Sequence, residues 1–416
     1  MNGTVLPSSS SATTAATPAR GSDSANANAG TGSKSLSIFG AETAELSSVM
    51  SGLGTVAAPG TSGNRYVPRM SLFAHTLDPR RESLVARLPK VELHLHIEGT
   101  LEPELMFALA QKHGVALPYQ SVDAVRAAYR FGDLQSFLDL YYAGCDVLRD
   151  RDDFAELARR YFARAAADNV VHAELFFDPQ THTARDVPIE TVLLGLRDAM
   201  HEARDARGIT SELILCFLRH LSEAEALATL DAALPYREHF IGVGLDSGER
   251  GNPPSKFTRV FAKARELGLH VVAHAGEEGP PAYIREALTL LEVERIDHGV
   301  RCDEDPALVS ELALAQIPLT VCPLSNQALR VTPDLRTHNF AKLLRAGIAV
   351  TINSDDPAYF GGYIADNYRA IADATELTFE ELVLCAENAA RAAFVPEPRK
   401  QGLLAQIRAA AAADGV

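Results

Sequence analysis

Cysteine and long apolar runs are scarce in this 416-residue chain. The five cysteines lie far apart and none belongs to a Cys-x-x-Cys pair, so the sequence predicts neither a disulfide framework nor a thiolate metal cage. No apolar run reaches the roughly 18 residues of a membrane span, and no basic stretch leads into an apolar core near Met1. We therefore expect a soluble, cytoplasmic protein with reduced thiols and no membrane partner.

Positive charge is also in short supply. Lysine and arginine number 39 against 54 aspartate and glutamate residues, which gives a formal net charge of −15 at pH 7. Such a chain repels a phosphate backbone, so nucleic acid is excluded as an expected partner and a small-molecule substrate remains. The sequence neither predicts nor excludes a homo-oligomer.

The first part of the chain has few large apolar side chains. Ser, Ala, Gly, Thr, Pro and Asn make up 49 of the first 69 residues. A segment of this composition cannot bury enough surface to offset the conformational entropy that folding removes. We predict a disordered, low-complexity tail over residues 1–75 and a single folded domain over residues 76–416.

From residue 91 onward, short runs of strand-like composition alternate with longer segments of helical period. This alternation is typical of parallel strands joined by helical crossovers, and eight such runs predict an α/β fold of the (β/α)8 TIM-barrel type. An open, doubly wound sheet is the alternative, but no Gly-x-Gly-x-x-Gly follows the first run. The predicted strands are Val91–His96, Val170–Phe177, Ile209–Leu218, Phe240–Asp246, His270–Ala275, Arg295–Val300, Ile317–Cys322 and Ile348–Asn353.

The connection between the first two predicted strands is unusually long. Residues 101–169 contain two or three amphipathic patterns, whereas a barrel needs only one crossover helix there. We expect extra helices in this segment, and we expect them to fold over the mouth of the barrel as part of a lid.

Histidine and acidic residues gather where several predicted strands end. In a barrel of this type, the reactive residues lie at the carboxyl ends of the strands. His94-Leu-His96 closes the first strand, and its two imidazoles point to the same side because side chains alternate along a strand. Further candidates lie at the ends of the fifth, sixth and eighth strands: His274, Glu277, Asp297, His298, Asp355 and Asp356.

These motifs are weak when each is taken alone. A His-x-His pair is common in ordinary packing, and Asp355-Asp356-Pro357 is also typical of a helix N-cap beside a turn. Together, three imidazoles and one carboxylate match a catalytic zinc ion that keeps one position open for water. Residues 240–248 contain no lysine that could bridge two ions, so we expect one Zn²⁺ per chain.

Two other histidine motifs are interpreted differently. His172-Ala-Glu174 matches half of the zinc signature of cytidine-type deaminases, but no Pro-Cys-x-x-Cys follows. We therefore interpret His172 and Glu174 as part of the barrel. His182 leaves two interpretations open, a residue at the border of the pocket or a surface histidine.

With these residues in view, the chain resembles the adenosine/adenine deaminase family of the metal-dependent amidohydrolase superfamily, and within it the adenine deaminase branch. The resemblance covers about residues 88–394 and is carried by the ordered blocks LPKVELHLHIEGTLEPEL, ELFFDPQTHT, GLDSGERGNPPSKF, VAHAGEEGPPAYI, RIDHGVR, IPLTVCPLSN and NSDDPAYFGGY. It implies a (β/α)8 barrel with a zinc ion held by His94, His96, His274 and Asp355.

The resemblance also implies roles for the remaining candidates. Glu277 would protonate the purine ring and His298 would assist the attacking water, as a general acid and a general base do. Asp356 would hydrogen-bond the imidazole edge of the purine, and the backbone near Gly248 would meet the pyrimidine edge. The adenine branch is expected to carry a second serine where this chain has Gly248.

Glu98 bears on the choice of substrate. The nucleoside-deaminating branch typically has His-x-His-x-Asp, with that aspartate facing the ribose, whereas Glu98 extends one methylene further into the same space. The expected function is zinc-dependent hydrolytic deamination of adenine to hypoxanthine and ammonia, in purine salvage. The alternatives are an adenosine deaminase, a deaminase of N6-substituted adenines, and a catalytically silent barrel that binds purine or a protein partner.

Overall fold

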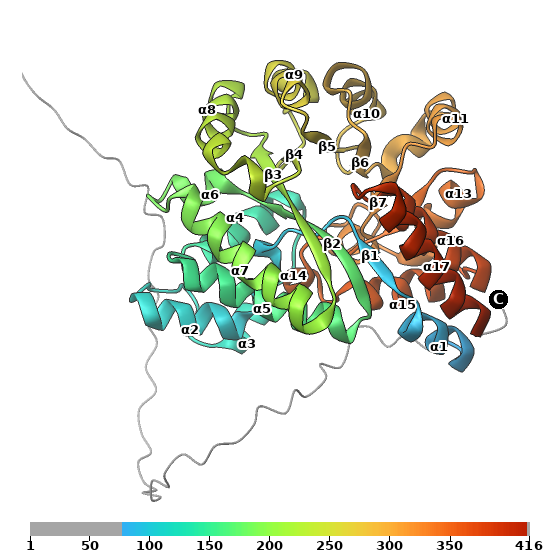
Figure 1. Cartoon of the computed structure of the whole chain (residues 1–416), viewed down its shortest axis with the longest axis horizontal. Coiled ribbons are helices and arrows are strands. Elements are labelled where there is room, and N and C mark those ends of the chain that lie inside the picture. Colours follow the sequence, from blue (N-terminus) through green and yellow to red (C-terminus); the bar gives the residue numbers. More distant parts are fainter. Residues whose placement is uncertain (1–76, 414–416) are drawn as a thin grey trace, which may run out of the picture. The chain divides into compact units, whose positions relative to one another are not determined.

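The computed structural model describes residues 77–413, which form a barrel of eight parallel strands (Figure 1). Neighbouring strands pair in chain order, and a bridge between Leu95 and Asp355 joins the segments after the first and last strands. The predicted (β/α)8 barrel is confirmed, whereas the tail predicted for residues 1–75 lies outside the described residues. The strands are β1 (Lys90–Glu92), β2 (Val170–Phe177), β3 (Thr210–Leu218), β4 (Gly242–Asp246), β5 (His270–Ala275), β6 (Arg295–His298), β7 (Leu319–Val321) and β8 (Val350–Ile352).

Helices follow the strands and surround them, as Figure 1 shows for the row from α8 to α11. Within residues 77–413, no helix is both long enough and apolar enough to cross a membrane. The helices are α1 (Pro79–Arg87), α2 (Pro103–His113), α3 (Val122–Ala128), α4 (Leu134–Cys145), α5 (Arg151–Ala167), α6 (Pro179–Thr183), α7 (Ile189–Arg207), α8 (Glu223–Ala233), α9 (Thr258–Glu266), α10 (Pro281–Glu286), α11 (Pro306–Ala315), α12 (Pro323–Ala328), α13 (Phe340–Arg345), α14 (Pro357–Phe360), α15 (Ile364–Ala374), α16 (Phe379–Ala392) and α17 (Glu397–Ala413).

The crossover helix α7 shows how the sequence specifies these elements. Val192, Leu196, Ala199 and Ala203 recur every three or four residues and are buried, so one face of the helix is apolar. The helix ends at Gly208, whose φ of 72° lies in the left-handed region that glycine adopts most readily. An apolar face and a glycine stop are enough to place this helix against the barrel.

The long connection after β1 contains the extra helices that the sequence predicted. Helices α2, α3 and α4 precede α5, which is the crossover helix to β2. Helix α4 contributes Leu134, Phe137, Leu138 and Tyr141 to the lining of a cavity at the carboxyl end of the barrel. The surplus segment therefore covers part of the barrel mouth.

The first strand is shorter than predicted. It ends before His94, because the Leu93 N–H donates to the side-chain oxygen of Asn353 (2.9 Å) and leaves the strand ladder. The following residues still run beside the end of β8. The Asp355 N–H donates to the His94 carbonyl, and the His96 N–H donates to the Asp355 carbonyl, both at 3.0 Å. This exchange holds both histidines next to Asp355.

Candidate active site

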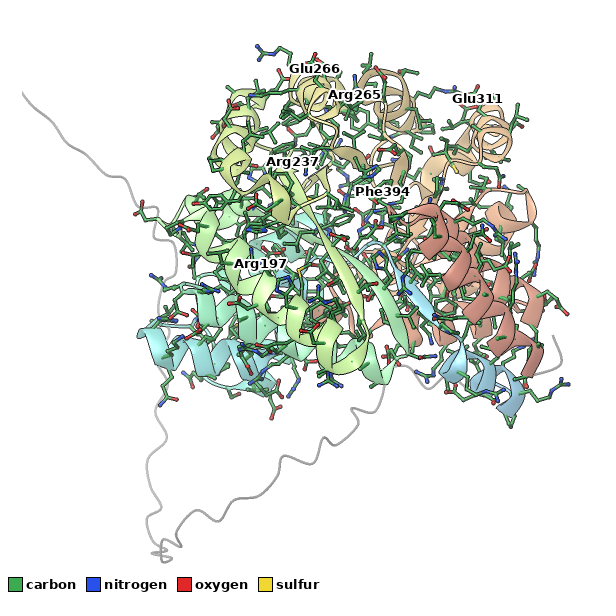
Figure 2. The ribbon with its side chains drawn as sticks, in the orientation of Figure 1. Arg197, Arg237, Arg265, Glu266, Glu311 and Phe394 are labelled. Atoms are coloured by element: carbon green, nitrogen blue, oxygen red, sulfur yellow. The ribbon has the colours of Figure 1, made fainter. Side chains whose placement is uncertain are left out.

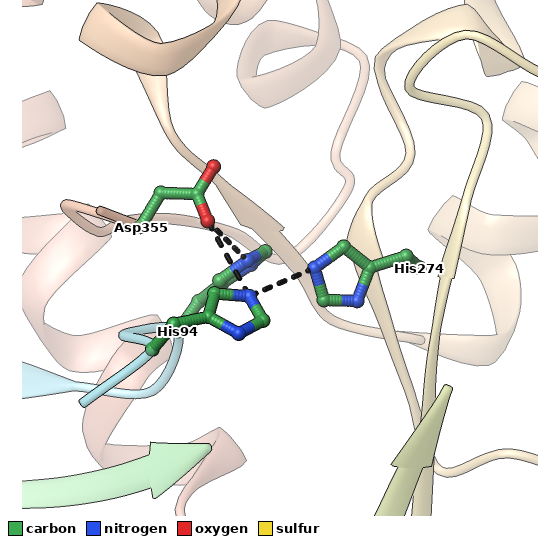
Figure 3. A group of neighbouring side chains, drawn as sticks. His94, His274 and Asp355 are labelled. Carbon is green, nitrogen blue, oxygen red and sulfur yellow. Dashed lines mark hydrogen bonds and ion pairs between the residues drawn. The ribbon is translucent and has the colours of Figure 1, made fainter. Parts of the chain in front are cut away.

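Four side chains meet at the carboxyl end of the barrel. His94 and His96 follow β1, His274 lies in β5 and Asp355 follows β8. The Nε2 atoms of His94 and His96 lie 3.2 and 3.5 Å from Asp355 Oδ1 (Figure 3). The Nε2 atoms of His96 and His274 lie 3.2 Å apart. All four side chains are buried, and the fold brings the four predicted metal ligands together.

The outer nitrogens of two of these rings face hydrogen-bond acceptors. His94 Nδ1 lies 3.0 Å from Thr320 Oγ1, and His96 Nδ1 lies 3.5 Å from Asp246 Oδ2. A proton on each Nδ1 leaves the Nε2 lone pairs facing other lone pairs, which is repulsive unless a cation lies between them. His94 Nε2 is buried and has no hydrogen-bond partner among the described residues. The donor set therefore fits a divalent metal ion with nitrogen and oxygen ligands.

The charges of the cluster lead to the same conclusion. Burial raises the pKa of Asp355, but His94 and the other imidazoles reverse this and hold it well below its usual value. Burial lowers the pKa of His94, but the Asp355 carboxylate reverses this and raises it. Burial and the positive charge of His94 hold the pKa of His274 well below its usual value, so that ring is neutral. The cluster therefore combines an ionised carboxylate with a neutral imidazole, and both are forms that bind a metal ion.

Glu277 and His298 lie beside this cluster, after β5 and at the end of β6. His298 Nε2 is 3.7 Å from Glu277 Oε2 and 3.7 Å from Asp355 Oδ2. Burial raises the pKa of Glu277 well above its usual value, and the negative charges of Asp355 and Glu249 raise it further. Burial and the charge of His94 lower the pKa of His298 to about 3. Burial thus favours the protonated form of the Glu277 carboxyl beside a neutral His298 imidazole, which places a proton donor next to a proton acceptor.

Three residues at this end of the barrel have a left-handed backbone. The φ angle is 63° at His298, 64° at Asp355 and 71° at Ser247. In residues other than glycine such conformations cost about 1–3 kcal/mol each, and they persist where the surrounding structure enforces them. They lie at or after the ends of β6, β8 and β4, where candidate catalytic side chains enter the cavity.

A cavity opens onto the cluster. Leu134, Phe137 and Leu138 of α4, with Phe360 of α14, form much of its apolar lining. A cavity that joins an apolar wall to convergent polar groups is typical of a site for a small molecule. The acidic and histidine side chains in its lining are His96, Asp178, Asp246, His274, Glu277, His298, Asp355 and Asp356.

The three predicted substrate contacts occupy different places. Asp356 lines the cavity, and Gly248 lines an adjoining recess that shares part of the same lining. Glu98 lines neither space within residues 77–413. Its Oε1 instead accepts hydrogen bonds from His182 Nε2 (2.8 Å) and from the Asp178 N–H (3.1 Å). His182 is fully buried, so the interpretation of a surface histidine is wrong.

Sequence reasoning did not single out Glu249, Asp178 or Asp246. The Glu249 carboxylate accepts the backbone N–H groups of residues 276–279 at 2.7–3.1 Å, and so fixes the loop that carries Glu277. Asp178 and Asp246 line the cavity directly. All three lie at or just after the ends of β2 and β4, and this position was the signal that could have identified them.

Comparisons with known proteins agree with this geometry. Residues 89–410 match the family model described as adenosine deaminase. An adenine deaminase from Cupriavidus metallidurans is 60% identical over 332 residues, which cover 80% of this chain and 94% of that protein. The crystal structure of adenine deaminase from Arthrobacter aurescens shares 49% identity and a TM-score of 0.76, over 77% of this chain and 98% of that chain.

A second solved structure carries a metal. An amidohydrolase from Burkholderia ambifaria with bound Zn is 27% identical, with a TM-score of 0.76 over 83% of this chain and 97% of that chain. The predicted family is thereby confirmed together with the barrel, and the cluster of three histidines and one aspartate lies where a metal-dependent hydrolase of this fold needs it. The chain belongs to the adenosine deaminase family.

Proposed function

We propose that this chain is an adenine deaminase, which converts adenine and water to hypoxanthine and ammonia. The observation that carries the proposal is one cavity in which a metal-fitting cluster meets Glu277, whose pKa is raised, and His298, whose pKa is lowered. Hydrolytic removal of an amino group from a purine needs an activated water, a proton donor to the ring and a proton acceptor. Relatives that are 58–60% identical and bear the name adenine deaminase support adenine as the substrate.

We propose that His94, His96, His274 and Asp355 hold one zinc ion. When bound, zinc lowers the pKa of a coordinated water from 15.7 to about 7, which supplies a nucleophile at neutral pH. The choice of one ion is supported by strand β4, whose residues Gly242–Asp246 bring no lysine to this end of the barrel. The choice of zinc is supported by the nitrogen-rich ligand set.

Glu277 acts as the general acid on the purine ring. Attack at the carbon that bears the amino group pushes an electron pair onto the adjacent ring nitrogen. The protonated carboxyl of Glu277 donates its proton to that nitrogen and stabilises the tetrahedral intermediate. Glu249 supports this step, because it holds the backbone on both sides of Glu277 in place. Proton donation of this kind contributes about 10²–10⁴-fold to the rate.

His298 acts as the general base. Its lowered pKa keeps the imidazole neutral, so it accepts a proton from the attacking water and later passes it to the departing amine. The Asp355 carboxylate, 3.7 Å away, stabilises the positive charge that His298 carries between these two transfers. The carbon–nitrogen bond then breaks and ammonia leaves, while the hydroxyl proton returns to the Glu277 carboxylate as the carbonyl group of hypoxanthine forms.

Asp356 and Gly248 are proposed to orient the purine. Burial and the charge of Asp355 raise the pKa of Asp356 well above its usual value, so its carboxyl donates to a nitrogen on the imidazole edge. The backbone near Gly248 meets the pyrimidine edge. Gly99 makes this arrangement possible, because a Cβ added there would lie 2.1 Å from Asp356 Oδ1 and 2.7 Å from the Asp356 backbone.

We propose that Glu98 favours adenine over adenosine indirectly, because it positions Asp178. It holds the backbone of Asp178, whose side chain lines the cavity and has a buried Oδ1 without a hydrogen-bond partner among the described residues. Free adenine carries an N–H on its imidazole ring that a nucleoside replaces with a sugar. A buried acceptor that binds this N–H discriminates strongly against molecules that lack it.

Ultraviolet turnover assays on adenine, adenosine and an N6-alkyl adenine test the proposal. We expect adenine to be the fastest substrate, with activity lost after chelator treatment and restored by Zn²⁺. A higher rate with adenosine or with the N6-alkyl adenine would assign the chain to that activity instead. Zinc-loaded protein that turns over none of the three would favour the catalytically silent barrel.

A further inference from the structure

His274, Asp297 and Thr320 lie side by side on three neighbouring strands. The register pairs His274 of β5 with Asp297 of β6, and Asp297 with Thr320 of β7. Asp297 is fully buried and, within residues 77–413, is not part of the cavity lining. It has no contact with the space that a substrate occupies, and it is not one of the proposed metal ligands. A buried carboxylate at this place needs another role.

On one side, Asp297 is connected to His94 through a hydroxyl group. The Thr320 hydroxyl donates to Asp297 Oδ1 (2.8 Å), and the same Thr320 oxygen lies 3.0 Å from His94 Nδ1. Because the Thr320 hydroxyl donates its proton to Asp297, the Thr320 oxygen can only accept a hydrogen bond from His94. His94 Nδ1 must therefore be the donor, which assigns the ring proton to Nδ1.

On the other side, Asp297 faces His274 directly. Asp297 Oδ2 lies 3.7 Å from His274 Nδ1. Both atoms are buried, and neither has a hydrogen-bond partner among the described residues. A carboxylate oxygen and an imidazole nitrogen that face each other without competing partners form a hydrogen bond after a small ring movement, with the nitrogen as the donor.

We infer that Asp297 is a positioning residue for the metal site, which together with Thr320 holds His94 and His274 with the proton on Nδ1. In that form the Nε2 lone pair of each ring points at the metal position. A carboxylate behind a ligating imidazole fixes its tautomer and orientation and strengthens its binding to the metal. The inference rests on the proposed metal site and adds the group that orients two of its ligands.

Asp246 provides an informative contrast. It lies 3.5 Å from His96 Nδ1 and also lines the cavity, so its replacement would change metal binding and substrate binding together. Asp297 is within 4.0 Å of the Nδ1 atoms of both His94 and His274 and stays behind them. Substitutions at Asp297 should therefore change metal binding without changing the lining of the cavity.

The test is the affinity of the metal-free protein for Zn²⁺, measured by competition with a chromophoric chelator. We expect Asp297→Asn and Thr320→Val to weaken zinc binding about 10–100-fold, because an outer partner of a ligating histidine is lost. Thr320→Ser keeps the hydroxyl and should keep the parental affinity. Thr351→Val is the matched control, since Thr351 is buried, pairs with Thr320 in the register of β7 and β8, and has no hydrogen bond to a ligating histidine.

The inference would be overturned if Asp297→Asn and Thr320→Val bound zinc as tightly as the parental protein. It would also be overturned if Thr351→Val lost as much zinc affinity as they do. Circular dichroism of the metal-free variants shows whether each one folds. If Asp297→Asn does not fold, the difference between Thr320→Val and Thr320→Ser decides. Zinc affinity is measured without substrate, so a parental protein that binds zinc but does not deaminate adenine would end the proposed function and leave this inference standing.

Discussion

Buried charges are compensated in different ways at the two ends of the barrel interior. Toward the amino ends of the strands, Arg295 and Glu174 are fully buried and form an ion pair at 2.7 Å. Phe394, labelled in Figure 2, places its ring 4.4 Å from the Arg295 guanidinium. At the carboxyl end, three imidazoles converge on Asp355 in an arrangement that fits a metal ion. The buried Arg295 thus has its counter-ion within the protein, whereas the histidine–aspartate cluster fits a cation that comes from outside.

Lys90 extends the contrast. It is the first residue of β1, and its buried ammonium group donates to the carbonyls of Val85, Leu88 and Asp168 at 2.6–3.1 Å. A buried charge whose hydrogen bonds are all made within the protein contributes to the integrity of the fold. Buried polar atoms without partners call for a separate explanation, of which a bound ion or a catalytic role is one. Changes at one end should therefore affect stability, and changes at the other should affect activity.

Glu277→Gln should have the largest effect, confined to the carboxyl end. Glutamine has the same size but cannot give a proton to the purine ring, so we expect kcat to fall about 10²–10⁴-fold. Zinc content and the thermal unfolding midpoint should stay at the parental values. Turnover, metal analysis and thermal unfolding of one preparation check all three. A variant that keeps more than about a tenth of the parental rate would show that Glu277 is not the general acid.

Glu174→Gln should lower the stability of the protein and leave its kcat unchanged, the reverse of Glu277→Gln. It leaves the buried Arg295 charge without its partner, and loss of one member of a buried ion pair costs about 3–5 kcal/mol of unfolding free energy. We expect this loss in denaturant titrations, with kcat per zinc-loaded folded protein unchanged. The matched control is Glu202→Gln, which breaks the exposed pair of Glu202 and Arg159 (2.8 Å) and should cost about 0–1 kcal/mol.

The stability difference between the parent and Glu174→Gln should depend on pH. Burial raises the pKa of Glu174, but Arg295 and His172 reverse this and lower it from 4.5 to about 2. A carboxyl with a lowered pKa in the folded state stabilises the protein above its unfolded pKa, and this contribution is lost as pH falls toward the folded value. The difference should shrink from about pH 4.5 down to about pH 2. A constant difference over this range would mean that the ion pair is not its source.

The barrel and the gathering of His94, His96, His274 and Asp355 at one end of it were predictable because both depend on patterns that are local in sequence. Alternating strand-like and helical runs predict the fold, and His94-Leu-His96 at a strand end predicts two ligands on one side. The exact end of β1 was not predictable. It depends on the side chain of Asn353, which takes the Leu93 N–H from a distance of 260 residues along the chain.

The role of Glu98 was also beyond local reasoning. Its position after His-x-His suggests a direct substrate contact, yet in the structure it binds His182, 84 residues further along the chain. Asp297 was singled out only as a residue at a strand end. Its relation to His274 and Thr320 depends on strand register, which the sequence does not reveal.

Phe394→Leu should give the smallest effect and refine the description of the amino end. The Phe394 ring stacks on His270 with centroids 4.0 Å apart and also faces the buried Arg295 guanidinium. A desolvated cation–π contact is worth about 2 kcal/mol, against about 0.5–1 kcal/mol at an exposed site. Phe379→Leu is the control, because Phe379 faces the exposed Arg80 at 5.3 Å. Chemical denaturation should therefore show a larger loss for Phe394→Leu than for Phe379→Leu, with adenine turnover unchanged in both. Equal losses would mean that burial of Arg295 adds nothing to this contact, and that Glu174 and the backbone carbonyls of Leu93 and Ala392 satisfy the buried cation without the ring.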